Sequence, residues 1–317
     1  MIAPVKAVTI RDGDLVIEEH PDPEPGSGEI LVRVRAAGLN GADMLQRRGR
    51  YPAPSGSPQD IPGLELAGEV VGQGPGANRF AEGDRVMAIV GGGGQAELAV
   101  LHERAAMPVP DGLDWPEAGG VPEVFTTAHD AVFGQAGLQA GERLLVHGAA
   151  GGVGTAAVQL GRAAGARVVA TVRNEALRDG VAQLGAEVLP HDGFADKGPY
   201  DVILELVGAP NLGDNVNALA TLGRIAVIGI GGGAKGELNL AALMGKRGRI
   251  SASTLRARPL EEKAAATRLV ERHVLPLLES GAVKALVHET FPLDRATEAY
   301  ESFTAGGKLG KIVLTVD

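Results

Sequence analysis

Cysteine is absent from the 317-residue sequence, and its absence excludes a whole group of functions. Without thiols the chain cannot form disulfides, use a cysteine nucleophile, hold an iron–sulfur cluster or bind zinc through cysteines. Aromatic residues are also scarce, at 3% of the chain, so a hydrophobic core must be built from aliphatic side chains.

Basic clusters are lacking as well, and the net charge is −9. An acidic chain without such clusters is a poor binder of nucleic acid or of anionic membrane. The uncharged stretch 144–161 is marginally long enough to span a bilayer, but glycines interrupt it and favour a strand, a turn and a helix. The first residues, MIAPVKAVTI, show no signal peptide. We therefore expect a cytoplasmic protein with no nucleic-acid or membrane partner.

Glycine is abundant, with 47 residues, and it separates the short segments of two different sequence patterns along the chain. Over the first ~120 residues, short apolar runs alternate with turns rich in Gly, Pro and Asp, which is typical of a compact β-barrel-like domain. The expected strands are 29–36, 65–71, 84–90 and 96–100.

From residue 143 onward strands alternate with helices, which predicts a doubly wound parallel sheet and an α/β fold. The expected strands are 143–147, 167–172, 201–206, 224–229, 250–255 and 310–316. The expected helices are 152–164, 175–184, 211–220 and 261–280.

The segment LLVHGAAGGVGTAAVQL is typical of a strand, a glycine-rich turn and a helix that together bind a dinucleotide. Gly151 would let the backbone approach a pyrophosphate, Gly154 would let the helix pack on the strand, and Ala149 departs from the strict motif. The alternative is a tight turn in an α/β domain that binds nothing. The predicted cofactor-binding turn consists of Gly148, Ala149, Ala150, Gly151, Gly152, Val153 and Gly154.

The residue after the next strand bears on the choice between NAD and NADP. An NAD site places a carboxylate there for the ribose hydroxyls, whereas this chain has Arg173, which could bind a 2′-phosphate. A solvated loop arginine is the alternative, and Glu175 lies close by. The pattern favours NADPH.

Later strand ends also belong to the expected cofactor site, because ligands of doubly wound sheets bind at the carboxyl ends of strands. The segment AVIGIGGG includes Gly229 and Ile230, and Val207–Gly208 follows the preceding strand. Both are expected to flank the nicotinamide half, although AVIGIGGG could also be a plain turn.

Several motifs in the same order resemble the medium-chain dehydrogenase/reductase superfamily, in its zeta-crystallin-like quinone oxidoreductase branch. They are GLNGADMLQRRGRYP, IPGLELAGEV, GDRVMAIVGGGGQAEL, VPEVFTTAHDAV, HGAAGGVGTAAVQL and LGKIVL. The resemblance implies a Rossmann NADPH-binding domain over residues 121–256. It also implies a GroES-like β-barrel catalytic domain over residues 1–120 and 257–317.

The zinc-binding relatives hold their catalytic metal with a cysteine and a histidine. By resemblance, the corresponding positions in this chain are Asn40 and Leu64. A further ligand position is near Glu123. An amide and an isobutyl group cannot complete a tetrahedral zinc site, so no metal is expected. Without a Lewis acid, alcohol oxidation is disfavoured, while reduction of an electrophilic conjugated acceptor stays feasible.

The resemblance also implies the remaining site residues. Asn40 and Tyr51 would be donors or orienting groups for the acceptor, and Asp43 would orient their loop. Their plainer interpretations are a loop-forming amide and a packing aromatic. The implied cofactor contacts are Thr127 at the nicotinamide carboxamide, Ser253, Thr254, Leu255 and Lys311, with a surface lysine as the alternative for Lys311.

Reduction of a quinone by NADPH is the leading function, because aromatisation stabilises the product oxyanion without a strong acid. An NADPH-dependent reductase of α,β-unsaturated carbonyls is the close alternative. A catalytically weak NADPH-binding structural or regulatory protein is the third. The strand 250–255 resembles the edge through which relatives pair, so a homodimer is expected.

Overall fold

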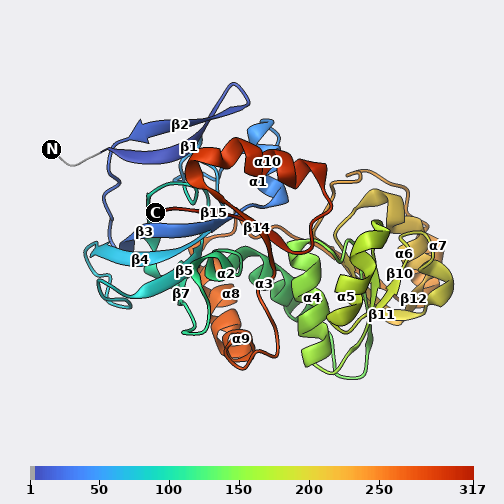
Figure 1. The fold of residues 1–317 in the computed structure, drawn as a ribbon. Helices are drawn as coiled ribbons and strands as arrows, with labels where there is room; N and C mark the ends of the chain where they lie inside the picture. The colour runs from blue at the N-terminus through green and yellow to red at the C-terminus, as the bar shows by residue number, and fades with distance from the viewer. Residues whose placement is uncertain (1–3) are drawn as a thin grey trace.

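The computed structural model describes residues 4–317 and divides them between two lobes, each built on its own large sheet. The first lobe, at the left of Figure 1, contains the first and the last strands of the described residues. The second lobe contains only the middle of the chain. The α/β fold expected from the sequence is confirmed.

The sheet of the first lobe has seven strands and is mostly antiparallel, in the order β14-β15-β3-β4-β5-β7, with β6 also paired to β3. Its strands are β3 (Glu29–Gly38), β4 (Glu65–Gln73), β5 (Arg85–Ile89), β6 (Leu98–His102), β7 (Ala106–Pro108), β14 (Val287–Pro292) and β15 (Lys311–Thr315). A separate hairpin is formed by β1 (Val5–Arg11) and β2 (Asp14–His20). Strand β15 lies between β14 and β3, so the sheet pairs Val313 with Gly38, 275 residues earlier in the chain.

The sheet of the second lobe has six parallel strands in the order β10-β9-β8-β11-β12-β13. They are β8 (Arg143–Val146), β9 (Arg167–Thr171), β10 (Glu187–Leu189), β11 (Tyr200–Glu205), β12 (Leu219–Val227) and β13 (Arg249–Ala252). The chain crosses from β8 outward to β10 and then returns to β11 on the other side of β8. Ligands of such sheets bind at this reversal, beyond the carboxyl ends of the two central strands.

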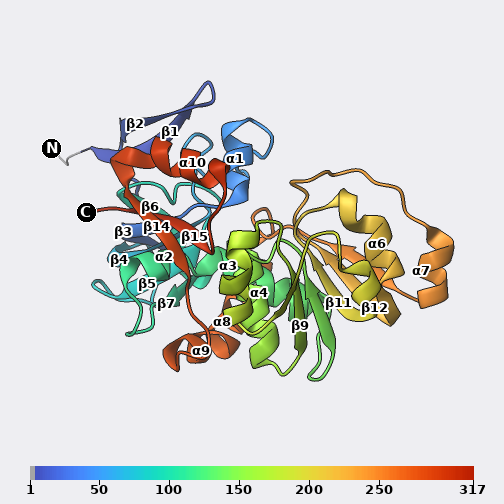
Figure 2. The ribbon, with the colours of Figure 1, turned by 45° about the vertical axis from the view of Figure 1, so that its right-hand side comes forward.

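Both faces of the parallel sheet are buried under helices, as Figures 1 and 2 show. Alternate residues explain this, because Leu144 and Val202 join the core beneath α4 while Leu145 and Ile203 join the core beneath α6. The helices are α4 (Gly152–Ala163), α5 (Arg178–Gln183), α6 (Leu212–Asn217) and α7 (Leu240–Lys246).

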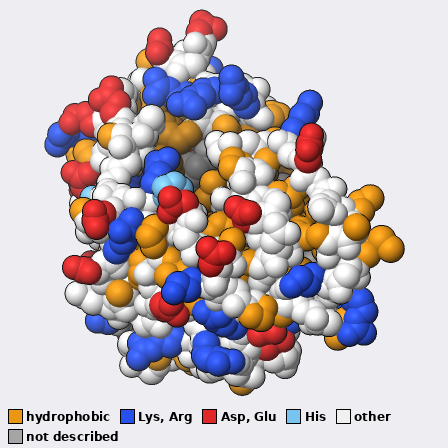
Figure 3. Space-filling view, turned by 90° about the vertical axis from the view of Figure 1, so that its right-hand side faces the viewer, with side chains coloured by type: hydrophobic (Ala, Val, Ile, Leu, Met, Phe, Trp, Pro, Cys, Tyr) orange, Lys and Arg blue, Asp and Glu red, His pale blue; other side chains and the backbone are white. Residues whose placement is uncertain are grey.

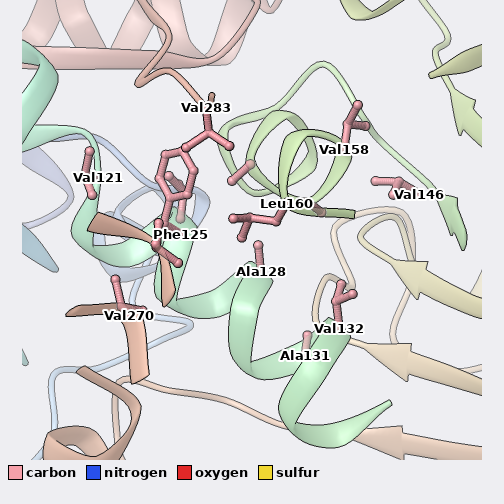
Figure 4. Packing of buried hydrophobic residues seen from close by; sticks show 14 of the residues in the cluster. Val121, Phe125, Ala128, Ala131, Val132, Val146, Val158, Leu160, Val270 and Val283 are labelled. Carbon is pink, nitrogen blue, oxygen red and sulfur yellow. The ribbon is translucent and has the colours of Figure 1, made fainter. Parts of the chain in front are cut away.

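The two lobes share one hydrophobic core, which runs through helix α3 (Pro122–His129). Figure 4 shows Phe125 of α3 beside Val283 and Leu160, which come from opposite lobes. The same cluster includes Met87 of β5 and Val146 of β8. A shared core of this kind fixes the position of α3 relative to both sheets.

The remaining helices pack on the first lobe or at the junction of the lobes. They are α1 (Gly41–Arg47), α2 (Trp115–Gly119), α8 (Leu260–His273), α9 (Leu275–Glu279) and α10 (Ala296–Ala305). Short helical segments occur in both lobes: η1 (Glu103–Ala105), η2 (Asp130–Gln135), η3 (Glu175–Leu177), η4 (Ala195–Lys197), η5 (Ala209–Asn211) and η6 (Leu293–Arg295). In Figure 2, α10 lies above β14 and β15, near α1.

Several expected elements differ in the structure. The expected helix 211–220 ends at Asn217 as α6, and β12 begins at Leu219 rather than at residue 224. The expected helix 261–280 is divided at Val274 into α8 and α9, because Pro276 has no N–H to continue the helical ladder and its ring excludes the carbonyl four residues earlier. The expected strand 250–255 ends at Ala252, and the chain then turns so that Leu255 packs beside Ile89 and Ala266.

Candidate active site

The glycine turn lies at the reversal of the parallel sheet. Strand β8 ends at Val146, and α4 begins at Gly152 with Gly151 as its N-cap and no side chain capping it. Uncapped N–H groups at the start of a twelve-residue helix are suited to an anion such as a phosphate. A Cβ on Gly154 would lie 2.6 Å from the Cα of Ala149, so glycine is needed for this close approach of helix and turn.

The turn is also tied to the first lobe. The Gly310 N–H donates to the Ala150 carbonyl at 2.9 Å, just before β15 begins. Figure 3 shows the side of the molecule that lies at the right of Figure 1. The upper part of this side has a hollow, with hydrophobic side chains in its wall and Lys or Arg side chains on its rim. The glycine turn therefore lies where the two lobes meet.

A buried polar network lies at His147, directly before the glycine turn. His147 Nε2 lies 2.8 Å from Asn215 Oδ1, and its Nδ1 lies 2.9 Å from the Thr171 hydroxyl. Burial lowers the pKa of His147 despite the nearby Glu205, so the imidazole is neutral and acts as a structural group.

Glu205, at the end of β11, completes this network and holds the next loop. Its Oε1 accepts the N–H groups of Val207 and Gly208 at 2.6 and 2.8 Å, and its Oε2 accepts from the Asn215 amide at 2.7 Å. The sequence interpretation missed Glu205, although a carboxylate at the end of the apolar run VILE was a visible signal. Its function is to fix the backbone of a loop expected to flank the nicotinamide.

A second polar network lies at the base of the first lobe and is centred on Lys311 of β15. Its Nζ donates to the Leu39 carbonyl at 2.5 Å, to Asn40 Oδ1 at 2.9 Å and to Glu65 Oε1 at 2.6 Å. Lys311 is 4% exposed, so a surface position is excluded. We call Lys311, Glu65 and Asn40 the buried ion-pair network.

The side chain of Asn40 is fully engaged in this network. Its Nδ2 donates to Glu65 Oε1 at 2.9 Å and to the Gly38 carbonyl at 3.2 Å, while its oxygen accepts from Lys311. With both donor hydrogens used within the protein, Asn40 is placed to hold the network together rather than to donate to an acceptor.

Asp43 secures the loop that carries Asn40. Its Oδ2 accepts the Asn40 N–H at 2.7 Å, and its Oδ1 accepts the Gly63 N–H at 3.1 Å. Burial raises the pKa of Asp43 to about 6, although these two hydrogen bonds and Lys311 oppose the shift. These contacts fix the backbone between Asn40 and Asp43 against the Gly63 segment.

Glu123 and Thr127 lie one turn apart on α3 and face the buried ion-pair network. The Glu123 N–H donates to Glu65 Oε2 at 2.8 Å, and the Thr127 hydroxyl lies 3.4 Å from Glu123 Oε1. Burial, followed by the charges of Glu65 and Asp43, raises the pKa of Glu123 to about 8. Glu123 therefore holds a proton at neutral pH.

Tyr51 is positioned by Arg256, a residue that the sequence interpretation also missed. Arg256 is 2% exposed and donates to the carbonyls of Gly91 and Tyr51 and to Gln46 Oε1, at 2.7, 3.1 and 2.6 Å. Its guanidinium carbon lies 5.3 Å from the centroid of the Tyr51 ring. Nothing in the sequence near Arg256 marks it as an anchor, because its partners are distant in the chain.

The residues at the zinc-ligand positions of the zinc-dependent relatives do not fit a zinc ion. Leu64 has no donor atom, and the oxygen of Asn40 is occupied by the Lys311 ammonium, whose positive charge would repel a cation. Within residues 4–317 no three His, Cys, Asp or Glu side chains gather as metal ligands.

The remaining expected cofactor residues lie at or beyond strand ends of the parallel sheet. Arg173 follows β9 and is exposed, and Glu175 pairs with Arg178 at 3.4 Å instead of with Arg173. Gly229 and the exposed Ile230 follow β12. Beyond β13, the Ser253 hydroxyl accepts from Gln135, Thr254 is exposed, and Leu255 directs its side chain into the core.

Two surface cavities lie away from these groups. One, of about 480 Å³, lies between α3, α4 and α8 and contains the hydrogen-bonded pair His129 and His273. The other, of about 580 Å³, lies between α1 and α10. Neither is lined by the glycine turn or by the buried ion-pair network, so we do not assign the chemistry to them.

Models of two protein families match the chain. "Alcohol dehydrogenase GroES-like domain" matches residues 26–111, and "Zinc-binding dehydrogenase" matches residues 184–314. The structure of an alcohol dehydrogenase superfamily protein from Novosphingobium aromaticivorans superposes with a TM-score of 0.87 at 27% identity, covering 99% of this chain and all of that one. Together with the two sheets, these matches define an oxidoreductase of the medium-chain dehydrogenase/reductase class.

Proteins of similar sequence identify the branch of this class to which the chain belongs. A quinone oxidoreductase of Rattus norvegicus is 33% identical over 305 residues, covering 92% of this chain and 90% of that protein. The polyketide synthase GfsB of Streptomyces halstedii is 36% identical over 297 residues, which are 91% of this chain but only 5% of that protein. The chain thus belongs to the zeta-crystallin-like branch of the medium-chain dehydrogenases/reductases, a superfamily that uses nicotinamide cofactors.

Within residues 4–317, no helix is both long enough and apolar enough to cross a membrane.

Proposed function

We propose that the protein is a zinc-independent reductase that uses NADPH to reduce quinones. The observation that carries this proposal is the buried ion-pair network, in which Lys311 and Glu65 engage Asn40 at a zinc-ligand position of the zinc-dependent relatives. A site without a Lewis acid is suited to an acceptor that is already electrophilic. Identity of 33% with a quinone oxidoreductase over 92% of the chain supports the same acceptor class.

The chain's own groups fit the proposed cofactor. The uncapped start of α4 would bind the pyrophosphate, and the exposed Arg173 would pair with the 2′-phosphate of NADPH. The loops Val207–Gly208 and Gly229–Ile230, together with Thr127, would hold the nicotinamide half. When bound, NADPH supplies the hydride.

The residues of the first lobe would place the acceptor. Tyr51 presents its ring at the lobe junction, held there by Arg256. Asp43 and the buried ion-pair network fix the backbone of the Asn40 loop, so that the acceptor meets a rigid wall. Close approach and fixed orientation of cofactor and acceptor lower the barrier to a reaction of this kind.

The direct test is NADPH oxidation with a panel of quinones and a matched panel of α,β-unsaturated ketones and aldehydes. We expect rapid oxidation with quinones and slower oxidation with the enones. The reverse order would favour the enone reductase. Tight NADPH binding without oxidation by any acceptor would favour the structural or regulatory alternative.

We also propose that the chain forms a homodimer through the β13 side of the parallel sheet. Strand β13 is the outermost strand on that side and follows α7, on which Leu240 and Met244 are 64% and 76% exposed. An unpaired edge beside exposed apolar side chains is typical of a surface covered by another chain.

A further inference from the structure

One oxygen of the Glu123 carboxyl is buried but makes no hydrogen bond within the described residues. The other oxygen has only the Thr127 hydroxyl nearby, at 3.4 Å. Buried polar atoms nearly always have a partner, because leaving one unpaired is costly. A structural carboxyl in this position would be expected to use both oxygens, as Glu65 and Glu205 do.

We infer that the Glu123 carboxyl donates the proton that completes reduction of the acceptor, an inference that rests on the proposed reductase function. Glu123 would act beside Thr127, which lies on the same face of α3 and is the expected contact of the nicotinamide carboxamide.

The other groups near Glu123 are poor proton donors. The Lys311 ammonium gives its three hydrogens to Leu39, Asn40 and Glu65. Both amide hydrogens of Asn40 are likewise used. Burial raises the pKa of Tyr51 above its ordinary value of 10, which makes its hydroxyl a weaker acid than the Glu123 carboxyl.

Charged and polar groups from the surrounding elements affect the pKa of Glu123. Burial and the carboxylates of Glu65 and Asp43 favour the protonated form, while Lys311 and the Thr127 hydroxyl favour the ionised form. Across the lobe junction, the charge of Glu123 acts on Tyr51, Arg256, Arg258 and Lys263. The balance leaves the carboxyl protonated at neutral pH, with an O–H available.

The proposed step balances as follows for a quinone. A hydride from NADPH brings two electrons and one hydrogen to the quinone, giving the hydroquinone monoanion. The O–H bond of Glu123 then breaks, its proton forms the second O–H bond of the hydroquinone, and the electron pair stays on the carboxylate. A proton from solvent, the one that the overall reaction consumes, then restores the O–H bond of Glu123 before the next turnover.

The test is Glu123→Gln, which keeps the shape of the side chain but has no acidic proton. We expect kcat for quinone reduction to fall at least about tenfold, as for loss of a general acid, with NADPH affinity in fluorescence titration unchanged within about twofold. In the unsubstituted protein, kcat should be constant below neutrality and fall as pH rises through about 8, because only the protonated carboxyl can donate. Glu123→Gln should lose this fall, while Glu279→Gln, an exposed control on α9, should behave as the unsubstituted protein.

Infrared difference spectroscopy gives a readout that does not need turnover. The carbonyl stretch of a protonated carboxyl should be present at neutral pH, be lost in Glu123→Gln, and shift when 1,4-benzoquinone is added. An unshifted band, or a Glu123→Gln variant with unchanged kcat and an unchanged pH profile, would overturn the inference. A shifted band without turnover on any acceptor would instead contradict the proposed function and leave the contact supported.

Discussion

At the scale of single residues, the site is defined by charges whose partners are far away in the chain. Lys311 binds Asn40 and Glu65, which precede it by 271 and 246 residues. A buried ion pair that also satisfies its neighbours' hydrogen bonds is costly to break, because removing one partner leaves the other buried and uncompensated. The conformation of the Asn40 loop therefore depends on a residue from the opposite end of the sequence.

Arg173 is the residue on which cofactor choice should depend. We expect Arg173→Ala to raise KM for NADPH about 10- to 100-fold, since hydrogen bonds to a charged group contribute about 1.5–3 kcal/mol. KM for NADH, which has no 2′-phosphate, should hardly change.

Steady-state kinetics with both cofactors and one quinone measure this difference. Arg178→Ala is the matched control, because its guanidinium bonds the Val172 carbonyl and Glu175 within its own loop. Equal changes in KM for NADPH and NADH would contradict the proposed role of Arg173.

The sequence predicted one half of the site better than the other. The glycine turn was predictable because its residues are consecutive and its chemistry is local. Arg256 and Lys311 hold the other half, and their partners become neighbours only when the first lobe closes around β15. Local patterns carry no information about such pairs, and Lys311 was placed only by resemblance.

At the scale of elements, polar side chains at the ends of the parallel strands hold the loops that follow. The turn after β8 rests on His147, and the turn after β11 rests on Glu205, so a single network sets both loops. The short helix α1 is set in the same way by Asp43 at its first turn. The loops that we propose to bind the cofactor are here held by buried side chains at the element ends.

Removing the Glu205 carboxylate should loosen the loop it holds. Glu205→Ala leaves the N–H groups of Val207 and Gly208 without their acceptor, and we expect the free energy of unfolding to fall by about 2–4 kcal/mol. NADPH affinity should weaken as well, and Glu205→Gln, which keeps one acceptor oxygen, should recover part of both.

Urea denaturation and fluorescence titration with NADPH measure the two effects. A variant that is less stable but binds NADPH with unchanged affinity would show that Glu205 serves the fold alone. Unchanged stability would contradict the network itself.

The sequence located most elements correctly where hydrophobic patterns were strong. Strands β8, β9 and β11 and helix α4 begin within about one residue of their expected positions. Helices α7 and α10 and strand β14 were not expected, because their amphipathic patterns are short and their burial comes from the tertiary fold. Pro276 was the visible signal for the break between α8 and α9.

At the scale of the whole molecule, the exposed apolar surface is concentrated in residues 222–244 of the second lobe. Of the large hydrophobic side chains that are exposed, this segment contributes Leu222, Ile230, Leu238, Leu240 and Met244. Figure 3, which views the molecule from the side of α7 in Figure 1, shows hydrophobic side chains protruding at its right edge. Such a surface is consistent with the proposed dimer.

Met244→Glu should disrupt the proposed dimer by placing a charge in its apolar contact. We expect the unsubstituted protein to sediment as a dimer at micromolar concentration and the variant to shift towards the monomer. NADPH affinity should be retained, because α7 lies apart from the glycine turn and from the buried ion-pair network.

Analytical ultracentrifugation across a concentration series measures the shift. Leu269→Glu, an exposed apolar position on α8, is the matched control and should leave the sedimentation unchanged. A monomeric unsubstituted protein would contradict the homodimer.

The position of β15 between β14 and β3 has a consequence for biosynthesis. Translation proceeds from the amino end, so β3 and β4 leave the ribosome long before β15 exists, whereas all six strands of the parallel sheet are made in one continuous stretch. The strands of the second lobe can therefore pair on the ribosome while the sheet of the first lobe still has an open edge. Until β15 arrives, Glu65 has no ammonium partner and Ala150 has no tether from Gly310, so the nascent chain acquires its active site only at the end of synthesis of this region.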